Sequence, residues 1–367
     1  MTTLTSMAKH RRALHRIPEL DHSLPKTKGY IEAELAELGF EVFSPFGCAV
    51  CGYLDRGGES TIAFRADMDA LPICEKTGLP FASAHEGCMH ACGHDGHMAM
   101  VLELGRRLAE KDSLRYNILL IFQPAEETTG GAKPICETGL LERYKVRAIF
   151  GLHLWPSLEA GRIAGLPGPM MARSGEVTFT AEGRSVHLCK RETGLDALAA
   201  CVDFYSRAVE LEKALPSDVV RLMGFGHMEA GSVRNATAAN AVLEGSLRAL
   251  DDEVFFRLRD GLVDICERVA LSWGCQTSVR FSEGYPPVNN PSDMFDKASG
   301  LFHIERMPEP TMISEDFSWY QRHIPGLFLL LGCGPAPELH SADFSFDESV
   351  LETGVSFFEA MAEGAEW

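Results

Sequence analysis

The chain has 367 residues, which is long for one hydrophobic core, so its length predicts two domains. Hydrophobic residues make up 46% of the chain and charged residues 23%, a composition typical of soluble globular proteins. The formal net charge of -18 would repel a polyanion, and this excludes nucleic acid as an expected partner.

The expected location is the cytoplasm, without a membrane partner. The first 20 residues include basic side chains but no apolar core of signal-peptide length, and no later apolar run is long enough to span a membrane. Eleven cysteines form an odd count in a chain without a secretory signal, which favours reduced thiols over a disulfide framework.

Helices and buried strands alternate along the first part of the chain. Apolar residues at helical spacing, closed by Gly39, predict a helix at about 26–38, and further helices are expected at 97–110 and 348–363. The predicted strands are TIAFRA at 61–66, NILLIFQ at 117–123, AIFGLH at 148–153 and GLFLLLG at 326–332. Unbroken apolar strands interleaved with helices favour a largely parallel sheet covered on both faces.

The pattern changes between residues 173 and 284. There the sequence predicts a strand in GEVTFTAEG, a helix at 194–213, two strands in VVRLMGFGHM and NAVLEGSLRAL, a helix at 252–273 and a strand in CQTSVRF. This order is typical of a split ferredoxin-like α+β domain. We therefore predict an α/β domain formed by residues 1–172 and 285–367, interrupted by a smaller domain at 173–284.

Metal-capable side chains follow several of the predicted strands. They are Asp67, Asp69, Glu126, Glu127, His153 and His340, and the stretch MHACGHDGHM at 89–98 adds Cys92 and His94. Ligands bind at the carboxyl ends of strands in open parallel sheets, so we expect these side chains at one rim. Thiolate, imidazole and carboxylate suit zinc, and more than four candidates favour two ions about 4 Å apart. Because adjacent side chains cannot face the same way, one glutamate of the pair can bind metal while the other accepts a proton from water.

Two other assignments use some of the same atoms. One is a structural zinc site of four thiolates, with the ligands Cys48, Cys51, Cys88 and Cys92. In the other, Cys92 is a nucleophile and either His94 or His340 is its base. That second alternative leaves the two glutamates and His153 without a role.

Six motifs follow one another along the chain: IAFRADMDALPI, MHACGHDGHM, FQPAEETTGGA, GLHLWP, SEDFSWY and LHSADF. Together they resemble the peptidase family M20 amidohydrolases, in the subgroup that holds auxin-conjugate hydrolases, hippurate hydrolases and N-acetyl-diaminopimelate deacetylases. The resemblance covers essentially the whole chain. It implies a zinc-peptidase-like α/β catalytic domain and an inserted ferredoxin-like lid that forms a homodimer.

The resemblance also implies a centre of two divalent ions, with zinc expected and manganese as the alternative. The positions that match metal ligands are Cys92, His94, Glu127, His153 and His340. Glu126 matches the general acid/base, and Asp69 matches an acidic residue that supports the ligands. The implied activity is cleavage of the amide bond in an N-acyl-amino acid. The alternatives are an N-acetyl-diaminopimelate deacetylase and a catalytically silent relative that binds a metabolite.

Several positions of the inserted lid match residues that bind the substrate in the family. His187 matches a histidine that holds the oxyanion, and Asn235 and Arg248 match substrate-binding residues. The planar guanidinium of Arg248 suits a carboxylate. The chain departs from the family pattern at Arg191 and Glu192, where relatives carry Pro-His. In relatives this segment faces the amino acid part of the substrate, so the resemblance does not predict which amino acid this chain accepts. We hypothesise that Glu192 binds a cationic group of the substrate.

Overall fold

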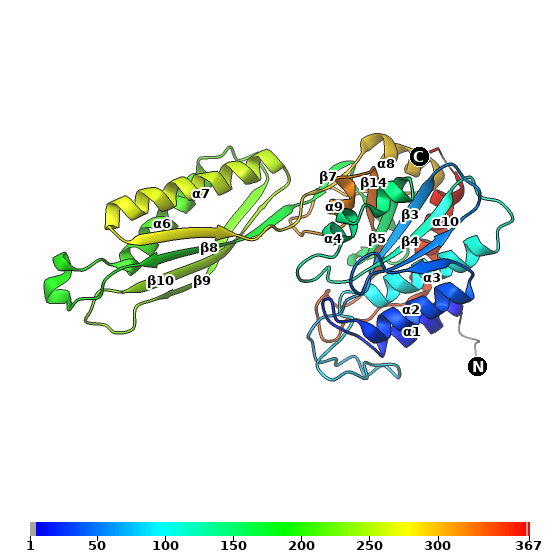
Figure 1. The fold of residues 1–367 in the computed structure, drawn as a ribbon, viewed down its shortest axis with the longest axis horizontal. Helices are drawn as coiled ribbons and strands as arrows, with labels where there is room; N and C mark the ends of the chain where they lie inside the picture. The colour runs from blue at the N-terminus through cyan, green and yellow to red at the C-terminus, as the bar shows by residue number, and fades with distance from the viewer. Residues whose placement is uncertain (1–4, 365) are drawn as a thin grey trace. The chain divides into compact units, whose positions relative to one another are not determined.

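The computed structural model describes residues 5–364 and 366–367 (Figure 1). The chain divides into two compact units: unit 1 comprises Met1–Met170, Val288–Glu309 and Asp316–Trp367, and unit 2 comprises Met171–Pro287 and Pro310–Glu315. The sequence-based boundaries lie close to these limits, but they assigned residues 310–315 to the larger domain. That segment belongs to unit 2 because its backbone pairs with the start of that unit, where Ala172 N donates to Ile313 O at 2.9 Å.

Unit 1 is built on an eight-stranded sheet of order β1-β2-β4-β3-β5-β14-β6-β13. The strands are β1 (Glu41–Phe43), β2 (Val50–Leu54), β3 (Thr61–Asp67), β4 (Asn117–Gln123), β5 (Val146–Glu159), β6 (Ile163–Gly165), β13 (Glu305–Arg306) and β14 (Gly326–Gly334). The central strands β4, β3, β5 and β14 run parallel, whereas β2 and β6 join them antiparallel. The mixed α/β class with a mostly parallel sheet is thus confirmed.

One predicted strand end was wrong. The apolar run suggested that the third strand stops at His153, but β5 continues to Glu159 alongside β14. Two glycines of β14 allow this close approach: a Cβ added at Gly332 or Gly334 would lie 2.0 Å from a carbonyl oxygen of β5. His153 therefore lies within the strand, opposite Leu330, rather than at its end.

The helices of unit 1 include three that the sequence predicted. The full set is α1 (Ser6–His15), α2 (Pro25–Glu37), α3 (His94–Ala109), α4 (Ala132–Glu137), α5 (Leu140–Arg143), α8 (Ser292–Leu301), α9 (Ser318–Gln321) and α10 (Leu351–Gly364). α3 begins earlier than its apolar periodicity indicated, because Gly93 adopts φ 86° and turns the chain into the helix directly after Cys92. Its first turn buries polar side chains, among them His94 and His97, so an apolar pattern could not detect it.

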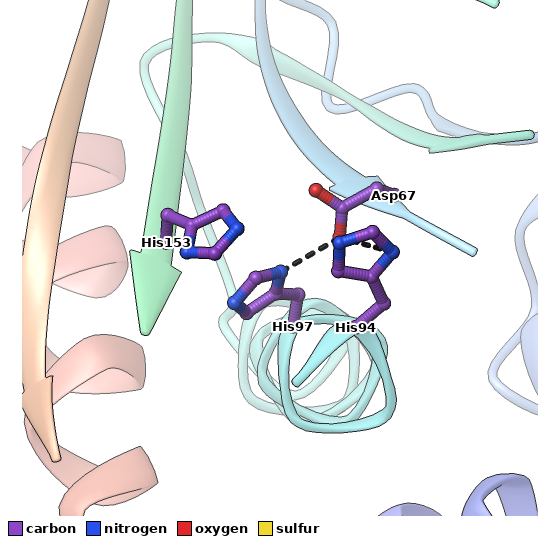
Figure 2. Close-up of side chains that lie close together, drawn as sticks. All are labelled: Asp67, His94, His97 and His153. Atoms are coloured by element: carbon purple, nitrogen blue, oxygen red, sulfur yellow. Dashed lines mark hydrogen bonds and ion pairs between the residues drawn. The ribbon is translucent and has the colours of Figure 1, made fainter. Parts of the chain in front are cut away.

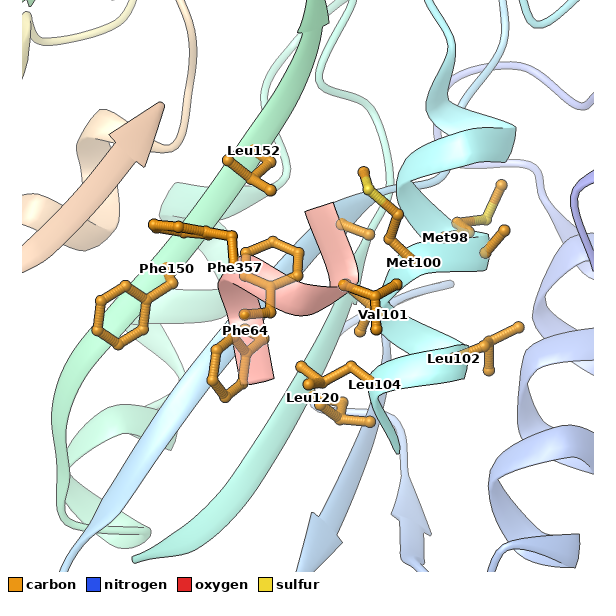
Figure 3. Close-up of a cluster of buried hydrophobic side chains, with 14 of the residues drawn as sticks. Phe64, Met98, Met100, Val101, Leu102, Leu104, Leu120, Phe150, Leu152 and Phe357 are labelled. Carbon is orange, nitrogen blue, oxygen red and sulfur yellow. The ribbon is translucent and has the colours of Figure 1, made fainter. Parts of the chain in front are cut away.

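The main core of unit 1 fills the space between the sheet and helices α3 and α10 (Figure 3). Phe64 and Phe150 stack at 5.6 Å between ring centroids, and Phe358 of α10 meets Phe64 edge-on. Because side chains alternate along a strand, the neighbours of these core residues point to the opposite face. This alternation directs Arg65 of β3 to the face away from α3.

Unit 2 follows the predicted order of strand, helix, two strands, helix and strand. Its elements are β8 (Arg173–Glu182), α6 (Ala197–Lys213), β9 (Arg221–Ala230), β10 (Asn240–Ala249), α7 (Asp252–Trp273) and β11 (Gln276–Phe281). The four strands form an antiparallel sheet of order β11-β8-β10-β9, and its core includes Phe179 stacked on Phe204. The predicted helix at 194–213 starts only at Ala197, because Asp196 caps α6 after a short 3-10 helix at Leu188–Thr193. In the part of the chain that the structure describes, no helix combines the length and apolarity of a membrane span.

Candidate metal centre

The structure brings the five sequence-predicted metal ligands together in unit 1. Cys92 Sγ lies 3.4 Å from His153 Nε2. Glu127 Oε1 lies 3.7 Å from His94 Nε2 and 3.3 Å from His340 Nε2. These side chains come from the N-terminus of α3, the middle of β5, and the loops after β4 and β14. All but His340 are buried or nearly so.

Backbone carbonyls set the orientation of two imidazole rings. His94 Nδ1 donates to Asp69 O, and His153 Nδ1 donates to Leu154 O, each at 2.8 Å. In a neutral ring, the proton on Nδ1 leaves a lone pair on Nε2, which is the arrangement found in metal-binding histidines. His94 and His153 thus turn their lone pairs toward the carboxylate of Glu127 and the sulfur of Cys92.

Acceptor atoms therefore face one another without a proton between them. His94 Nε2 and Glu127 Oε1 are both buried, and no residue that the structure describes gives His94 Nε2 a hydrogen bond; the imidazole nitrogens nearest Glu127 Oε1 are those of His94 and the half-exposed His340. Burying an acceptor without a hydrogen bond costs free energy, and two acceptors that point at each other also repel. A cation bound between them would remove both costs. A thiolate, imidazoles and a carboxylate form the donor set that a zinc-like divalent cation accepts, so the side chains fit such an ion.

The local electrostatics agree with a cation at this position. Burial, together with the charges of Glu127 and Glu126, raises the pKa of the Cys92 thiol well above its usual range, so a thiolate there needs a compensating positive charge. Burial alone would raise the pKa of Glu127, but His340 and His94 lower it to about 2. Burial and neighbouring His97 lower the pKa of His153 to about 3, which keeps its ring neutral at pH 7.

Asp69 holds the loop that carries the paired glutamates. Its carboxylate accepts the backbone N–H of Glu126 at 2.9 Å and that of Glu127 at 3.0 Å. Ala125, directly before them, adopts φ 60°, an uncommon conformation for a residue with a side chain. Asp69 thus contacts the loop through backbone bonds and His94 through its own carbonyl oxygen, which places it behind the ligands.

Asp67, which the sequence analysis counted among the metal-capable side chains, and His97, to which it gave no role, also belong to this region (Figure 2). His97 donates from Nδ1 to Asp67 Oδ1 at 2.7 Å and accepts the N–H of Leu154 at Nε2 at 2.9 Å. Both ring nitrogens are therefore occupied, so His97 supports the ligands rather than binding metal. His97 lies within MHACGHDGHM and Asp67 directly follows a predicted strand, but only the structure separates support from ligation.

The structure bears on both alternative uses of the cysteines. Among the described residues, Cys48, Cys51 and Cys88 join no group of metal-capable side chains, whereas Cys92 groups with His94 and Glu127. The four-thiolate zinc site is therefore wrong. The nucleophile hypothesis leaves His153 and Glu127 without a role, although Cys92 Sγ lies 3.4 Å from His153 Nε2 and groups with Glu127.

The predicted substrate residues all lie in unit 2, and two of them are neighbours. His187 pairs with Ala236 in an antiparallel bridge, and Leu188 N donates to Asn235 O at 3.0 Å. Arg248 lies on β10 and donates from Nη1 to Met312 O at 2.7 Å.

The remaining substrate candidate, Glu192, is exposed, and its carboxylate lies 3.6 Å from the guanidinium of Arg191. In the described part of the chain, no hydrogen bond joins Glu192 or Arg248 to His187. Backbone pairing of the two segments thus brings His187 and Asn235 close together, and it involves neither Glu192 nor Arg248.

A buried charge network lies behind the first turn of α3. His15 contacts Asp95 Oδ2 through Nδ1 at 2.8 Å and Glu75 Oε1 through Nε2 at 3.2 Å, and Arg11 donates to the same Asp95 oxygen at 3.2 Å. The centroid of the His90 ring lies 6.4 Å from that of the His15 ring. Burial lowers the pKa of His15, but the two carboxylates outweigh it, so the pKa is raised overall.

The raised pKa makes the stability that His15 contributes dependent on pH. A histidine whose pKa is higher in the folded state stabilises the fold fully below its unfolded pKa, about 6.5, and loses this contribution as the pH rises through the folded value. We expect His15→Asn to lower the urea midpoint of unfolding most below pH 6, with a smaller difference above pH 8. The matched control is the exposed His303→Asn. A difference for His15→Asn that does not vary between pH 5.5 and 8.5 would contradict this linkage.

Comparison with known proteins places this centre in a family. The profile of peptidase family M20/M25/M40 matches residues 63–364. An uncharacterized hydrolase of Staphylococcus saprophyticus is 34% identical over 373 residues, covering 98% of this chain and 97% of the relative.

Two solved structures agree with this match. The Bacillus subtilis YXEP protein, a dinuclear metal binding peptidase from the M20 family, superposes with a TM-score of 0.85 at 30% identity, covering 97% of this chain and 96% of that one. A proposed aminohydrolase from methicillin resistant Staphylococcus aureus gives a TM-score of 0.91 at 28% identity, with 97% and 95% covered. The chain therefore belongs to the peptidase family M20/M25/M40, and it is a metal-dependent hydrolase.

Proposed function

We propose that this chain cleaves the amide bond of N-acyl-amino acids at a centre of two divalent cations, with zinc preferred over manganese. The observation that carries the proposal is the set of buried acceptors, His94 Nε2 and Glu127 Oε1, that face each other beside Cys92 and His153. The YXEP protein, whose centre is dinuclear, supports the number of ions. When bound, two cations would lower the pKa of a water molecule and polarise the amide carbonyl.

Glu126 is the proposed general acid/base. Its backbone is fixed by Asp69, it is only 8% exposed, and the adjacent Glu127 faces the histidines. A carboxylate beside the ligand set can accept a proton from the attacking water and return it to the departing amine nitrogen. A protein that only bound a metabolite would have no use for this carboxylate, so Glu126 favours catalysis over silent binding.

His187 is the proposed donor to the oxyanion. Its Nδ1 accepts the backbone N–H of Cys189 at 3.3 Å, so a neutral ring carries its proton on Nε2, where it can donate outward. Asn235 adjoins His187 and is proposed to bind the same substrate. The Arg248 guanidinium is proposed to bind the α-carboxylate of the amino acid.

Unit 2 is proposed to act as a lid and as the surface of a homodimer. Its edge strand β9 leaves backbone groups open for pairing, and α6 exposes Leu198, Val202 and Tyr205 at helical spacing. Tyr205 contacts Phe225 of β9, so the open edge and the apolar stripe adjoin. A second copy would cover both features at once.

The proposed activity is tested with a panel of N-acetyl- and N-benzoyl-amino acids that includes acidic, neutral and basic members, their C-terminal amides and N-acetyl-diaminopimelate. We expect cleavage of the acids that a chelator abolishes and zinc restores, and weaker cleavage of the amides because Arg248 then lacks its carboxylate. Cleavage unaffected by the chelator, or no cleavage of any member by the zinc-loaded protein, would contradict the proposal.

The charge of Glu192 is expected to influence which amino acid is preferred. A carboxylate near the amino acid side chain would favour a cationic substrate group through opposite charge. We therefore expect Glu192→His to lower kcat/KM for basic N-acyl-amino acids about tenfold relative to neutral ones, measured on the same panel. The exposed Glu137→His serves as the control. Unchanged selectivity among acidic, neutral and basic substrates would exclude the role of Glu192.

A further inference from the structure

Asp316 is fully buried at the base of the loop that carries Glu126 and Glu127. Its Oδ2 accepts the backbone N–H of Gly131 at 2.9 Å and that of Ala132 at 3.0 Å, at the start of α4. Both carboxylate oxygens accept from Gln123 Nε2 at 2.8 Å, and Gln123 is the last residue of β4. One carboxylate thus binds the residue before the loop and the residues after it.

Arg65 joins Asp316 to the support behind the ligands. It donates from Nη2 to Asp316 Oδ1 at 2.8 Å, from Nε to Gln123 Oε1 at 3.0 Å and from Nη1 to Asp67 Oδ2 at 2.7 Å. The same Asp67 accepts from His97. All of these side chains are buried, and the charges of Arg65 and the two aspartates lie in direct contact. Removing one member would leave the others with unpaired buried groups.

The loop has little room to find another arrangement. A Cβ added at Gly131 would lie 2.0 Å from the carbonyl oxygen of Pro124, so the two ends of the loop cross in close contact. Gly130 N donates to Ala125 O at 2.9 Å, which turns the middle of the loop back on itself. Asp69 holds the glutamates at the tip of this loop, whereas Asp316 closes its base.

We propose that Asp316 is a positioning residue that fixes Glu126 and Glu127 by closing the base of their loop. The proposal rests on the proposed function, because it assigns the loop a metal ligand and a general acid/base. Asp316 touches neither substrate nor metal in this account; it acts through the backbone of Gly131 and Ala132. The Asp316 carboxylate accepts from N–H groups of Gly131, Ala132, Gln123 and Arg65, whereas an amide at the same place would direct its own N–H groups at some of these donors. One oxygen of the Asp316 carboxylate also lies within 4.8 Å of a Glu126 carboxylate oxygen, so hydrogen exchange and the zinc Kd, rather than kcat alone, report the positioning of the loop.

The test compares three variants of the full chain loaded with zinc. Asp316→Asn removes the negative charge of the carboxylate. Gln123→Met is a milder change that keeps Asp316 but removes the bonds from Gln123 to it, and it tests the proposal if Asp316→Asn does not fold. The control is Asn290→Ala, which removes a buried side chain that bonds Phe328 and Leu166, away from the loop. Three quantities are measured: hydrogen exchange of the 124–132 peptide, the Kd for zinc, and kcat and KM for an N-acyl-amino acid.

We expect Asp316→Asn to speed exchange in the 124–132 peptide, to raise the zinc Kd about tenfold and to lower kcat about 10- to 100-fold with little change in KM. Gln123→Met should shift each value in the same direction by less, and Asn290→Ala should lower only the melting temperature. Wild-type exchange, zinc Kd and kcat in both loop variants would overturn the proposal. A zinc-loaded wild-type protein without hydrolysis would refute the proposed function instead, while exchange and zinc Kd would still decide the role of Asp316.

Discussion

Replacing Glu126 with glutamine is expected to lower kcat by about 1000-fold while the protein keeps its metal. Glutamine preserves the shape of the side chain but cannot accept a proton from the attacking water, and positioned acid/base groups contribute about 100- to 10,000-fold to rates. Because Glu126 is held by its backbone N–H to Asp69, the substitution leaves the loop in place. Steady-state kinetics with an N-acyl-amino acid and metal content per chain measure the two effects.

A matched control separates the loss of the base from a general effect of the substitution. Glu137→Gln makes the same chemical change at an exposed position of α4, where the side chain pairs only loosely with Lys133. That variant should retain wild-type kcat. Near-wild-type turnover by Glu126→Gln would show that another group accepts the proton.

Replacing Glu127 with alanine is expected to release metal and to abolish activity as a consequence. Its Oε1 lies within 3.7 Å of His94 Nε2 and 3.3 Å of His340 Nε2, so it is the carboxylate that these imidazoles share. A bound ligand at 100 times its Kd stabilises a fold by about 2.7 kcal/mol, and this variant should lose that stabilisation by zinc. Elemental analysis and the melting temperature with and without zinc measure the outcome.

The two glutamate variants should therefore behave oppositely toward metal although their positions are adjacent. Glu126→Gln should retain the zinc-dependent rise in melting temperature, and Glu127→Ala should lack it. A Glu127→Ala protein that keeps its full metal content would remove Glu127 from the ligand set.

Much of the fold could be predicted because its strands are buried on both faces. TIAFRA and NILLIFQ have apolar runs that no surface strand would carry, and they became β3 and β4. The first turn of α3 could not be predicted from apolar spacing, since it buries His94 and His97. Residues 310–315 were misassigned because their contacts with unit 2, such as the bonds from Ala172 N to Ile313 O and from Arg248 to Met312 O, have no sequence signature.

The metal-capable side chains could be found because most of them follow a strand or precede a helix at the same end of the sheet, and His153 ends the apolar run of its strand although β5 continues past it. Of the residues that support these side chains, Asp69 was expected from the family resemblance, whereas Arg65 and Asp316 were not. Arg65 lies inside an apolar strand and Asp316 lies far along the chain, so nothing in the sequence indicated that their side chains meet at 2.8 Å. A histidine such as His97 can bind metal, and only the structure shows that both of its ring nitrogens already form hydrogen bonds.

The most direct test of the account is a zinc titration of the metal-free protein in which hydrolysis of an N-acyl-amino acid is followed at each addition. The account predicts that activity rises from zero and reaches its maximum at two zinc ions per chain. Hydrolysis by the metal-free protein, or zinc bound at any stoichiometry without hydrolysis of any substrate on the panel, would contradict it.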